Sequence, residues 1–156
     1  MIKLKKIFIL LTLFLFFFSC GYTPIFSKKD VNFSIENIVF LGDKDIKEKI
    51  SHALSSYKNK QNKEKKISLV ITSSKNTTIA SKNSQGEAQT KRISANVNVK
   101  IILAENNFLE KNFNKSSIYT VIDRKFEQKL IENKLINNLS NEIAQQIIFE
   151  ILKNTK

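Results

Sequence analysis

The chain has 156 residues, the size of one domain with a single hydrophobic core, and 26 basic against 14 acidic residues give a formal net charge of +12. Its one cysteine excludes an intramolecular disulfide, and its one histidine lacks the partner ligands of a metal site. No glycine-rich phosphate-binding loop is present, the single histidine has no catalytic partner, and no motif pairs a serine with a base. The sequence therefore predicts a protein that is not an enzyme and uses no cofactor.

The first 19 residues have the pattern of an export signal. Residues 1–6 are short and basic, and the 12 residues from 7 to 18 are apolar except for Thr12. This apolar run is shorter than the roughly 18–20 residues that comfortably span a bilayer, and a basic start is typical of signal peptides. The sequence therefore predicts a signal peptide over residues 1–19. Its removal would lower the formal net charge to +9.

The signal ends at Ser19-Cys20-Gly21, which resembles the lipobox of bacterial lipoproteins, although Phe17 is bulkier than the usual leucine. In such proteins the cysteine is acylated and becomes the first residue after cleavage. We expect Cys20 to carry the anchor, since two or three acyl chains hold a protein stably at a membrane. Gly21 is not the aspartate that retains enteric lipoproteins in the inner membrane, so the resemblance implies outer-membrane sorting. An uncleaved signal anchor with a buried or incidental Cys20 is the alternative.

Residues 20–30 contain the only proline and are predicted to form a tether, which leaves residues 31–156 as the folded domain. Residues 31–40 alternate apolar and polar positions and change phase after Ile35, which indicates a strand with a bulge. Asp45 and Glu48 have the spacing of a capping box at the start of a helix. The apolar stripe of this helix comprises Ile46, Ile50, Ala53, Leu54 and Tyr57.

Three further strands follow along the chain. Residues 67–74 form the second, with Thr77 and Ile79 as candidates for its continuation. Apolar residues occupy every second position from Ile93 to Leu103, the most regular strand pattern of the chain. Residues 105–107 are predicted to form a hairpin turn, and residues 108–119 to form the fourth strand.

Residues 123–153 contain no glycine or proline and are predicted to form one long amphipathic helix. A coiled coil is an alternative, but a helix lying across a sheet explains the wide apolar stripe more simply. The stripe comprises Phe126, Leu130, Leu135, Leu139, Ile143, Ile147 and Ile151.

The order strand, helix, strand, strand, strand, helix predicts an α+β fold, a two-layer sandwich with a four-stranded mixed sheet and two helices on one face. The crossover helix implies that the first two strands are parallel, and the short connections imply antiparallel pairing of the others. Ser94, Asn96, Asn98 and Lys100 would lie on the other face of the sheet. That face would meet water, a ligand or a polar partner.

The positive charge suggests an anionic neighbour, either lipid headgroups or nucleic acid. A coding bias would also explain it, since lysine, asparagine, isoleucine and phenylalanine are frequent while glycine, proline and tryptophan are scarce. Nucleic-acid binding would require aromatic residues among the basic ones on a strand or recognition helix. Residues 93–103 contain no aromatic residue, so no nucleic-acid partner is expected.

Several short segments, taken with the order of the elements, carry a family resemblance. They are Cys20-Gly21-Tyr22-Thr23-Pro24-Ile25-Phe26, the strand and helix of Val31 to Tyr57, Lys91-Arg92 before the alternating strand, and Ser117-x-Tyr119 before a helix containing Leu139 to Ile147. Together they resemble the LPS-assembly lipoprotein family, LptE, whose usual start is Cys-Gly-Phe-x-Pro-Leu-Tyr. The chain departs from the family in its high lysine and asparagine content and in its scarcity of arginine.

The resemblance implies a non-enzymatic, lipid-anchored outer-membrane protein whose domain faces the periplasm. Such a protein plugs the barrel of its partner LptD, helps it assemble and assists lipopolysaccharide transport. Lys91, Arg92 and Lys100 would be the first candidates for contact with lipopolysaccharide phosphates, because cationic side chains make charge-assisted hydrogen bonds. Solvated side chains or contacts with the barrel wall are the alternative for these residues. The alternative function is another periplasm-facing lipoprotein, an envelope adaptor or maintenance subunit.

Overall fold

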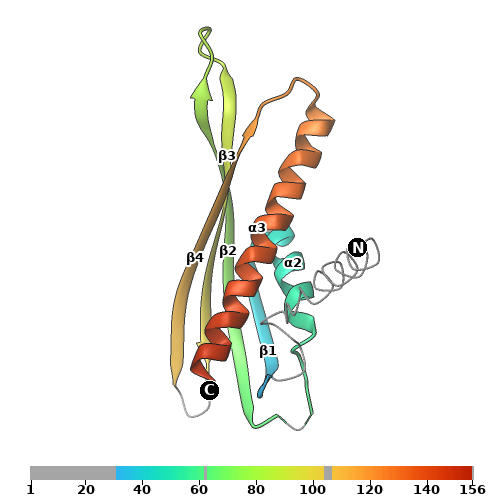
Figure 1. The fold of residues 1–156 in the computed structure, drawn as a ribbon, viewed down its shortest axis with the longest axis vertical. Coiled ribbons are helices and arrows are strands. Elements are labelled where there is room, and N and C mark those ends of the chain that lie inside the picture. The colour runs from blue at the N-terminus through green and yellow to red at the C-terminus, as the bar shows by residue number, and fades with distance from the viewer. Residues whose placement is uncertain (1–30, 62, 104–106, 156) are drawn as a thin grey trace, which may run out of the picture. The chain divides into compact units, whose positions relative to one another are not determined.

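The computed structural model describes residues 31–61, 63–103 and 107–155, and the elements below all lie in one compact unit, Asn32–Lys156. The predicted signal peptide, Cys20, the tether and most of the predicted turn at 105–107 lie outside the described residues. The elements are β1 (Phe33–Gly42), α2 (Lys44–Ser55), β2 (Lys65–Lys82), β3 (Ala88–Ile102), β4 (Phe108–Thr120) and α3 (Lys125–Asn154), drawn in Figure 1.

The four strands form one sheet in the order β1-β2-β3-β4. β1 is parallel to β2, while β2, β3 and β4 are antiparallel neighbours. Both helices lie on the same face of the sheet (Figure 1). This confirms the predicted α+β sandwich and its element order. No helix among the described residues is long and apolar enough to cross a bilayer.

The first strand and helix differ from the sequence prediction only at the two ends of the helix, which stops at Ser55 and leaves Tyr57 of the predicted stripe beyond it. The predicted bulge is present, because the register between β1 and β2 shifts between Ile35 and Asn37. The N-cap of α2 is Asp43 and not Asp45. The Asp43 carboxylate accepts hydrogen bonds from the backbone N–H groups of Asp45 and Ile46, both at 3.0 Å. Asp43 is extended and therefore has the backbone conformation of a cap, whereas Asp45 already lies within the helix.

β2 continues through the predicted extension as far as Lys82 and is 18 residues long. Its second half pairs polar residues with polar residues of β3, such as Asn76 with Ser94 and Thr78 with Arg92. An apolar periodicity cannot reveal a strand segment whose side chains are exposed on both faces. The strand is therefore longer than its apolar pattern.

The core lies between the sheet and the two helices. α2 contributes Ile46, Ile50 and Leu54, each fully buried. Burial of such side chains stabilises the fold by about 1.5–3 kcal/mol each. The other fully or nearly fully buried apolar residues are Phe33, Ile35, Ile67, Leu69, Ile71, Ile93, Ala95, Val97, Val99, Ile101, Ile136, Ile143, Ala144, Ile147 and Ile151.

The apolar stripe of α3 is buried only from Ile136 onward. Phe126 and Leu130 are 76% and 52% exposed, so the first part of the predicted stripe is not in the core. α3 has 30 residues and α2 only 12, and a helix of 12 residues can flank less than half of one of 30. In Figure 1 the first turns of α3 extend beyond α2.

Ser140 lies in the buried part of α3, and its hydroxyl makes no hydrogen bond within the described residues. A buried hydroxyl without a partner costs free energy, so Ser140→Ala should raise the free energy of unfolding by about 1 kcal/mol. Urea denaturation followed by circular dichroism measures this change. Ser51→Ala, at an exposed position of α2, is the control for helix propensity. No gain over that control would contradict the prediction.

Candidate functional site

The open face of the sheet, on the side away from the helices, carries the polar positions of the strand pattern. Along β3, the residues Ile93, Ala95, Val97, Val99 and Ile101 point to the helices and are at most 2% exposed. The residues between them must point the other way, because side chains alternate along a strand. These open-face residues of β3 are Arg92, Ser94, Asn96, Asn98 and Lys100.

Two rows of amides and hydroxyls cross the middle of the open face. Asn96 lies between Ser74 on β2 and Asn114 on β4, and Asn98 lies between Thr72 and Asn112. We call these six residues the asparagine rows. The Asn98 amide donates to Asn112 Oδ1 at 2.7 Å and to Glu110 Oε1 at 2.8 Å, and the Asn114 amide donates to Asn96 Oδ1.

The asparagine rows line a shallow depression of about 340 Å³. Amides and hydroxyls offer both hydrogen-bond donors and acceptors and carry no net charge. The depression can therefore meet a neutral polar partner, such as a hydrated surface or sugar hydroxyls, at every position of the two rows. The sequence pattern did not reveal the part that β4 plays, because the residue that faces Asn96 depends on the register of the β3–β4 pair.

Lys100 lies at one end of the open face. Its ammonium group is 4.0 Å from the centre of the Phe108 ring, a cation–π contact, and Glu110 is its register partner on β4. The contact holds the positive charge above an aromatic ring that is itself 55% exposed. Lys100 is therefore a half-buried cation beside an exposed apolar surface.

The structure does not bring the three predicted cationic residues together. Arg92 shares the open face with Lys100, but eight residues separate them, which corresponds to about 27 Å along the strand. Lys91 points to the helix side, where its register partners are Ile79 and Tyr119. A ligand that bound all three residues would therefore have to contact each of them through a different group.

Lys75 of β2 lies beside the start of α2 and is held by carboxylates. Its ammonium is 2.8 Å from Asp45 Oδ2 and 3.6 Å from Asp43 Oδ2. The hydrogen bond with Asp45 raises the pKa of Lys75, and the same hydrogen bond lowers the pKa of Asp45. The cluster ties β2 to the first turn of α2, so Lys75 has a structural role.

Tyr119 closes the space between β4 and α3. Its hydroxyl donates to Glu132, which also accepts from the Gln128 amide at 3.1 Å. Burial, together with the neighbouring Glu132 carboxylate, raises the pKa of Tyr119 far above its usual value. The phenol therefore stays protonated and acts as a donor that fixes the helix to the strand.

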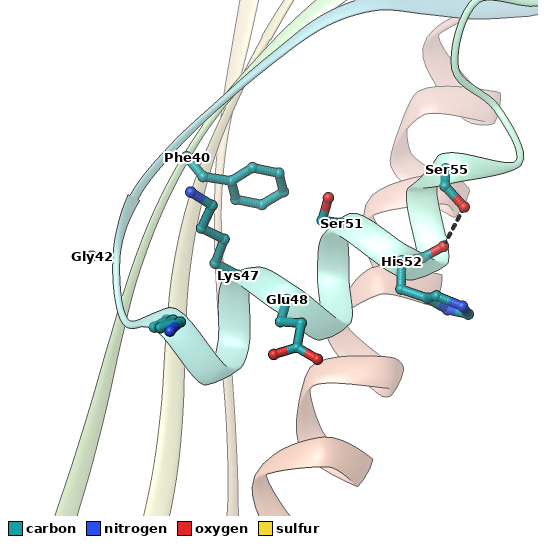
Figure 2. A pocket seen from close by; sticks show the side chains of 8 residues that line it. Phe40, Gly42, Lys47, Glu48, Ser51, His52 and Ser55 are labelled. Carbon is teal, nitrogen blue, oxygen red and sulfur yellow. Dashed lines mark hydrogen bonds between the residues drawn. The ribbon is translucent and has the colours of Figure 1, made fainter.

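A second hollow, of about 630 Å³, lies between the end of β1 and α2. Figure 2 shows Lys47 and Ser51 of α2 on the side of the helix nearest Phe40, while Glu48 and His52 point away. The Ser55 hydroxyl donates to the His52 carbonyl at 2.7 Å and so stays with its own helix. No histidine–serine pair poised for catalysis is present at this hollow.

Within residues 31–61, 63–103 and 107–155, no three histidine, cysteine or acidic residues are placed to hold a metal ion. The polar groups described above come from backbone caps, ion pairs and amide rows.

The fold is the one found in several solved bacterial lipoproteins. Rare lipoprotein B from Shewanella oneidensis superposes with a TM-score of 0.59 and 11% identity, over 77% of this chain and 96% of that one. An uncharacterized lipoprotein B from Nitrosomonas europaea gives 0.57 and 17%, over 81% and 89%. A minor lipoprotein from Acinetobacter baumannii gives 0.52 and 13%, over 77% and 94%.

At these identities the likeness shows a shared fold. It extends over most of this chain and nearly all of each lipoprotein chain. No family model matches the sequence, and no curated protein matches it significantly.

Proposed function

We propose that the chain is an outer-membrane lipoprotein of the LptE type, anchored by lipid on Cys20. Its domain would occupy the lumen of an LptD-type β-barrel, help that barrel to assemble and assist the transfer of lipopolysaccharide. The lipobox-like Ser19-Cys20-Gly21 and the fold shared with bacterial lipoproteins support the assignment to an envelope lipoprotein. The finer role depends on the open face of the sheet.

The observation that carries the plug role is the asparagine rows. A domain inside a barrel must present a surface that matches a hydrated, polar wall, because the lumen of a large barrel is polar. The open face offers amide and hydroxyl groups across three strands, with Arg92 and Lys100 toward its two ends. An apolar face would instead favour burial against another hydrophobic layer.

The test is a pull-down of the tagged full chain from detergent-solubilised membranes of its own host. We expect one large barrel protein to co-purify in about equal amount, since a plug and its barrel form a one-to-one complex. The mass of the purified chain should correspond to an acylated Cys20 at the N-terminus. An intact Met1 in the membrane fraction, or other envelope proteins without a barrel, would favour the adaptor or maintenance role and refute the plug.

The lipopolysaccharide contact is tested separately by charge reversal. The double variant Arg92→Glu and Lys100→Glu should bind lipopolysaccharide about tenfold more weakly or worse, because it loses two charge-assisted contacts. A direct titration of the purified chain with lipopolysaccharide measures the affinity.

The matched control is Lys60→Glu with Lys134→Glu, which makes the same change of charge at exposed positions away from the open face. Equal weakening by both double variants would mean that only net charge matters. Unchanged binding by the first would remove Arg92 and Lys100 from the ligand site and leave the plug role open.

A further inference from the structure

The edge strands of the sheet, β1 and β4, differ in how well they are protected against pairing with a further strand. On β4, Lys111 and Lys115 are in register with Val99 and Ala95 of β3 and therefore point to the helix side. The Lys115 ammonium is 3.5 Å from a Glu142 carboxylate oxygen. Inward-pointing lysines are a common device against edge-to-edge pairing, because an added strand would bury their charge. The β4 edge is thus unsuited to a further strand.

The β1 edge has no such protection beyond the bulge. Its residues 38–41 are Ile-Val-Phe-Leu, and on the open face Val39 and Leu41 are 42% and 54% exposed. The edge is covered at Ile35, whose N–H donates to the Tyr57 carbonyl at 2.9 Å and whose carbonyl accepts from the Asn59 N–H at 3.0 Å. Within the described part of the chain, no segment pairs with this edge between residues 38 and 41.

The backbone of β1 exposes hydrogen-bonding groups along this stretch. The Asp43 N–H donates to the Ser73 carbonyl at 3.1 Å and so points toward β2. In a parallel pair, alternate residues direct both backbone groups to the same neighbour. Leu41 and Val39 therefore also face β2, and Ile38 and Phe40 direct their N–H and C=O groups to the open edge.

Beside this edge lies the hollow between β1 and α2. Phe40 forms its apolar wall, and Lys44 and Lys47 line it together with a single carboxylate, that of Glu48. Glu48 is 3.8 Å from the Lys49 ammonium and points away from Phe40 in Figure 2. The side of the hollow that faces the edge is therefore apolar and positively charged.

We propose that the β1 edge accepts an extended, acidic segment of a partner protein as a fifth strand of the sheet. Its backbone would pair with Ile38 and Phe40, one apolar side chain would pack on Phe40, and an acidic side chain would meet Lys44 and Lys47. Strand addition at an open edge gains affinity from main-chain hydrogen bonds and specificity from alternate side chains. Lipid cannot satisfy a row of backbone donors and acceptors.

The tether of the chain itself is a poor candidate for this edge. Residues 22–30 contain Lys28 and Lys29, which match the charge of Lys44 and Lys47, and a proline, which cannot donate to a strand. The proposal goes beyond the barrel role and does not rest on it, because the edge and the open face are separate surfaces.

The test uses the full chain in detergent and a fluorescent peptide, Glu-Thr-Val-Thr-Glu-Thr, whose valine and glutamates share one face of a strand. Matched peptides have lysine in place of glutamate or every amide N-methylated. Anisotropy titrations should show that the acidic peptide binds about tenfold more tightly than either matched peptide. Hydrogen exchange of the Ile38 and Phe40 amides should slow when the acidic peptide is bound.

The variant Lys44→Glu with Lys47→Glu should reverse the preference between the acidic and basic peptides. Both lysines are exposed, so this variant is expected to fold. Phe40→Ala should weaken binding several-fold, while Phe149→Ala, exposed on α3, should not. Equal binding of the acidic peptide by the wild type and the charge-reversed variant would overturn the proposal, as would unchanged exchange at Ile38 and Phe40. Protection of these amides by dimerisation without peptide would assign the edge to a second copy and also overturn it.

Discussion

Replacing Gly42 with alanine is expected to destabilise the domain by about 3 kcal/mol or more, one of the two largest effects on stability that we predict. Gly42 ends β1 with a φ of +100°, a conformation that side chains disfavour. A Cβ atom there would lie 1.9 Å from the Ser73 carbonyl oxygen and 2.9 Å from its carbon. Both groups are backbone, so neither can rotate away. Urea denaturation of the purified chain, followed by circular dichroism, measures the loss.

Gly86 provides the matched control. It also has a positive φ, of +85°, but no atom lies within 4 Å of the position that its Cβ would occupy. Gly86→Ala should therefore cost only the backbone strain, about 1–2 kcal/mol. If the two variants lost equal stability, close contact between β1 and β2 at Gly42 would not be the reason for the glycine.

The alternation of apolar residues was sufficient to predict the layers of the fold. In β3, strict alternation from Ile93 to Ile101 defines one buried and one open face, because only one phase places all five apolar side chains in the core. The change of phase after Ile35 similarly predicted the bulge, since a strand can return an apolar set to the core only by inserting a residue.

The start of α2 could not be assigned from spacing alone. Asp43 and Asp45 are both good capping residues, and Asp45 has a glutamate three positions later. The choice is made by Gly42, whose positive φ turns the chain and leaves Asp43 extended beside Ser73 of β2. The contact between the end of β1 and Ser73 of β2 therefore decides where the helix begins.

The candidate site on the open face was likewise predictable from the sequence only in part. Arg92 and Lys100 are an even number of residues apart on β3, so the sequence alone placed them on one face. The contact of Asn96 and Asn98 with asparagines of β4 instead depends on how the two strands pair. That register follows from the connection between β3 and β4, which polar composition does not specify. The asparagines in the sequence therefore predicted a polar strand, but they did not predict the asparagine rows that run across β2, β3 and β4.

The second large effect contrasts two positions of α3 that the apolar spacing treats as equivalent. Ile143 is fully buried and Phe126 is 76% exposed. Ile143→Ala should lower the free energy of unfolding by about 3 kcal/mol, because it removes buried methyl groups and leaves a cavity between α3 and the sheet. Phe126→Ala should change it by about 0.5 kcal/mol at most, since few packing contacts are lost.

Urea titrations of the two variants against the wild type measure this contrast. Similar losses from both variants would mean that the first turns of α3 are buried in the protein in solution, by a partner or by a second copy. A small loss from Ile143→Ala would instead contradict the packing of α3 against the sheet. The expected inequality follows from the length of α2, because its 12 residues cannot cover the 30 residues of α3. Burial, and not spacing, then determines which apolar residues of the stripe hold the helix to the sheet.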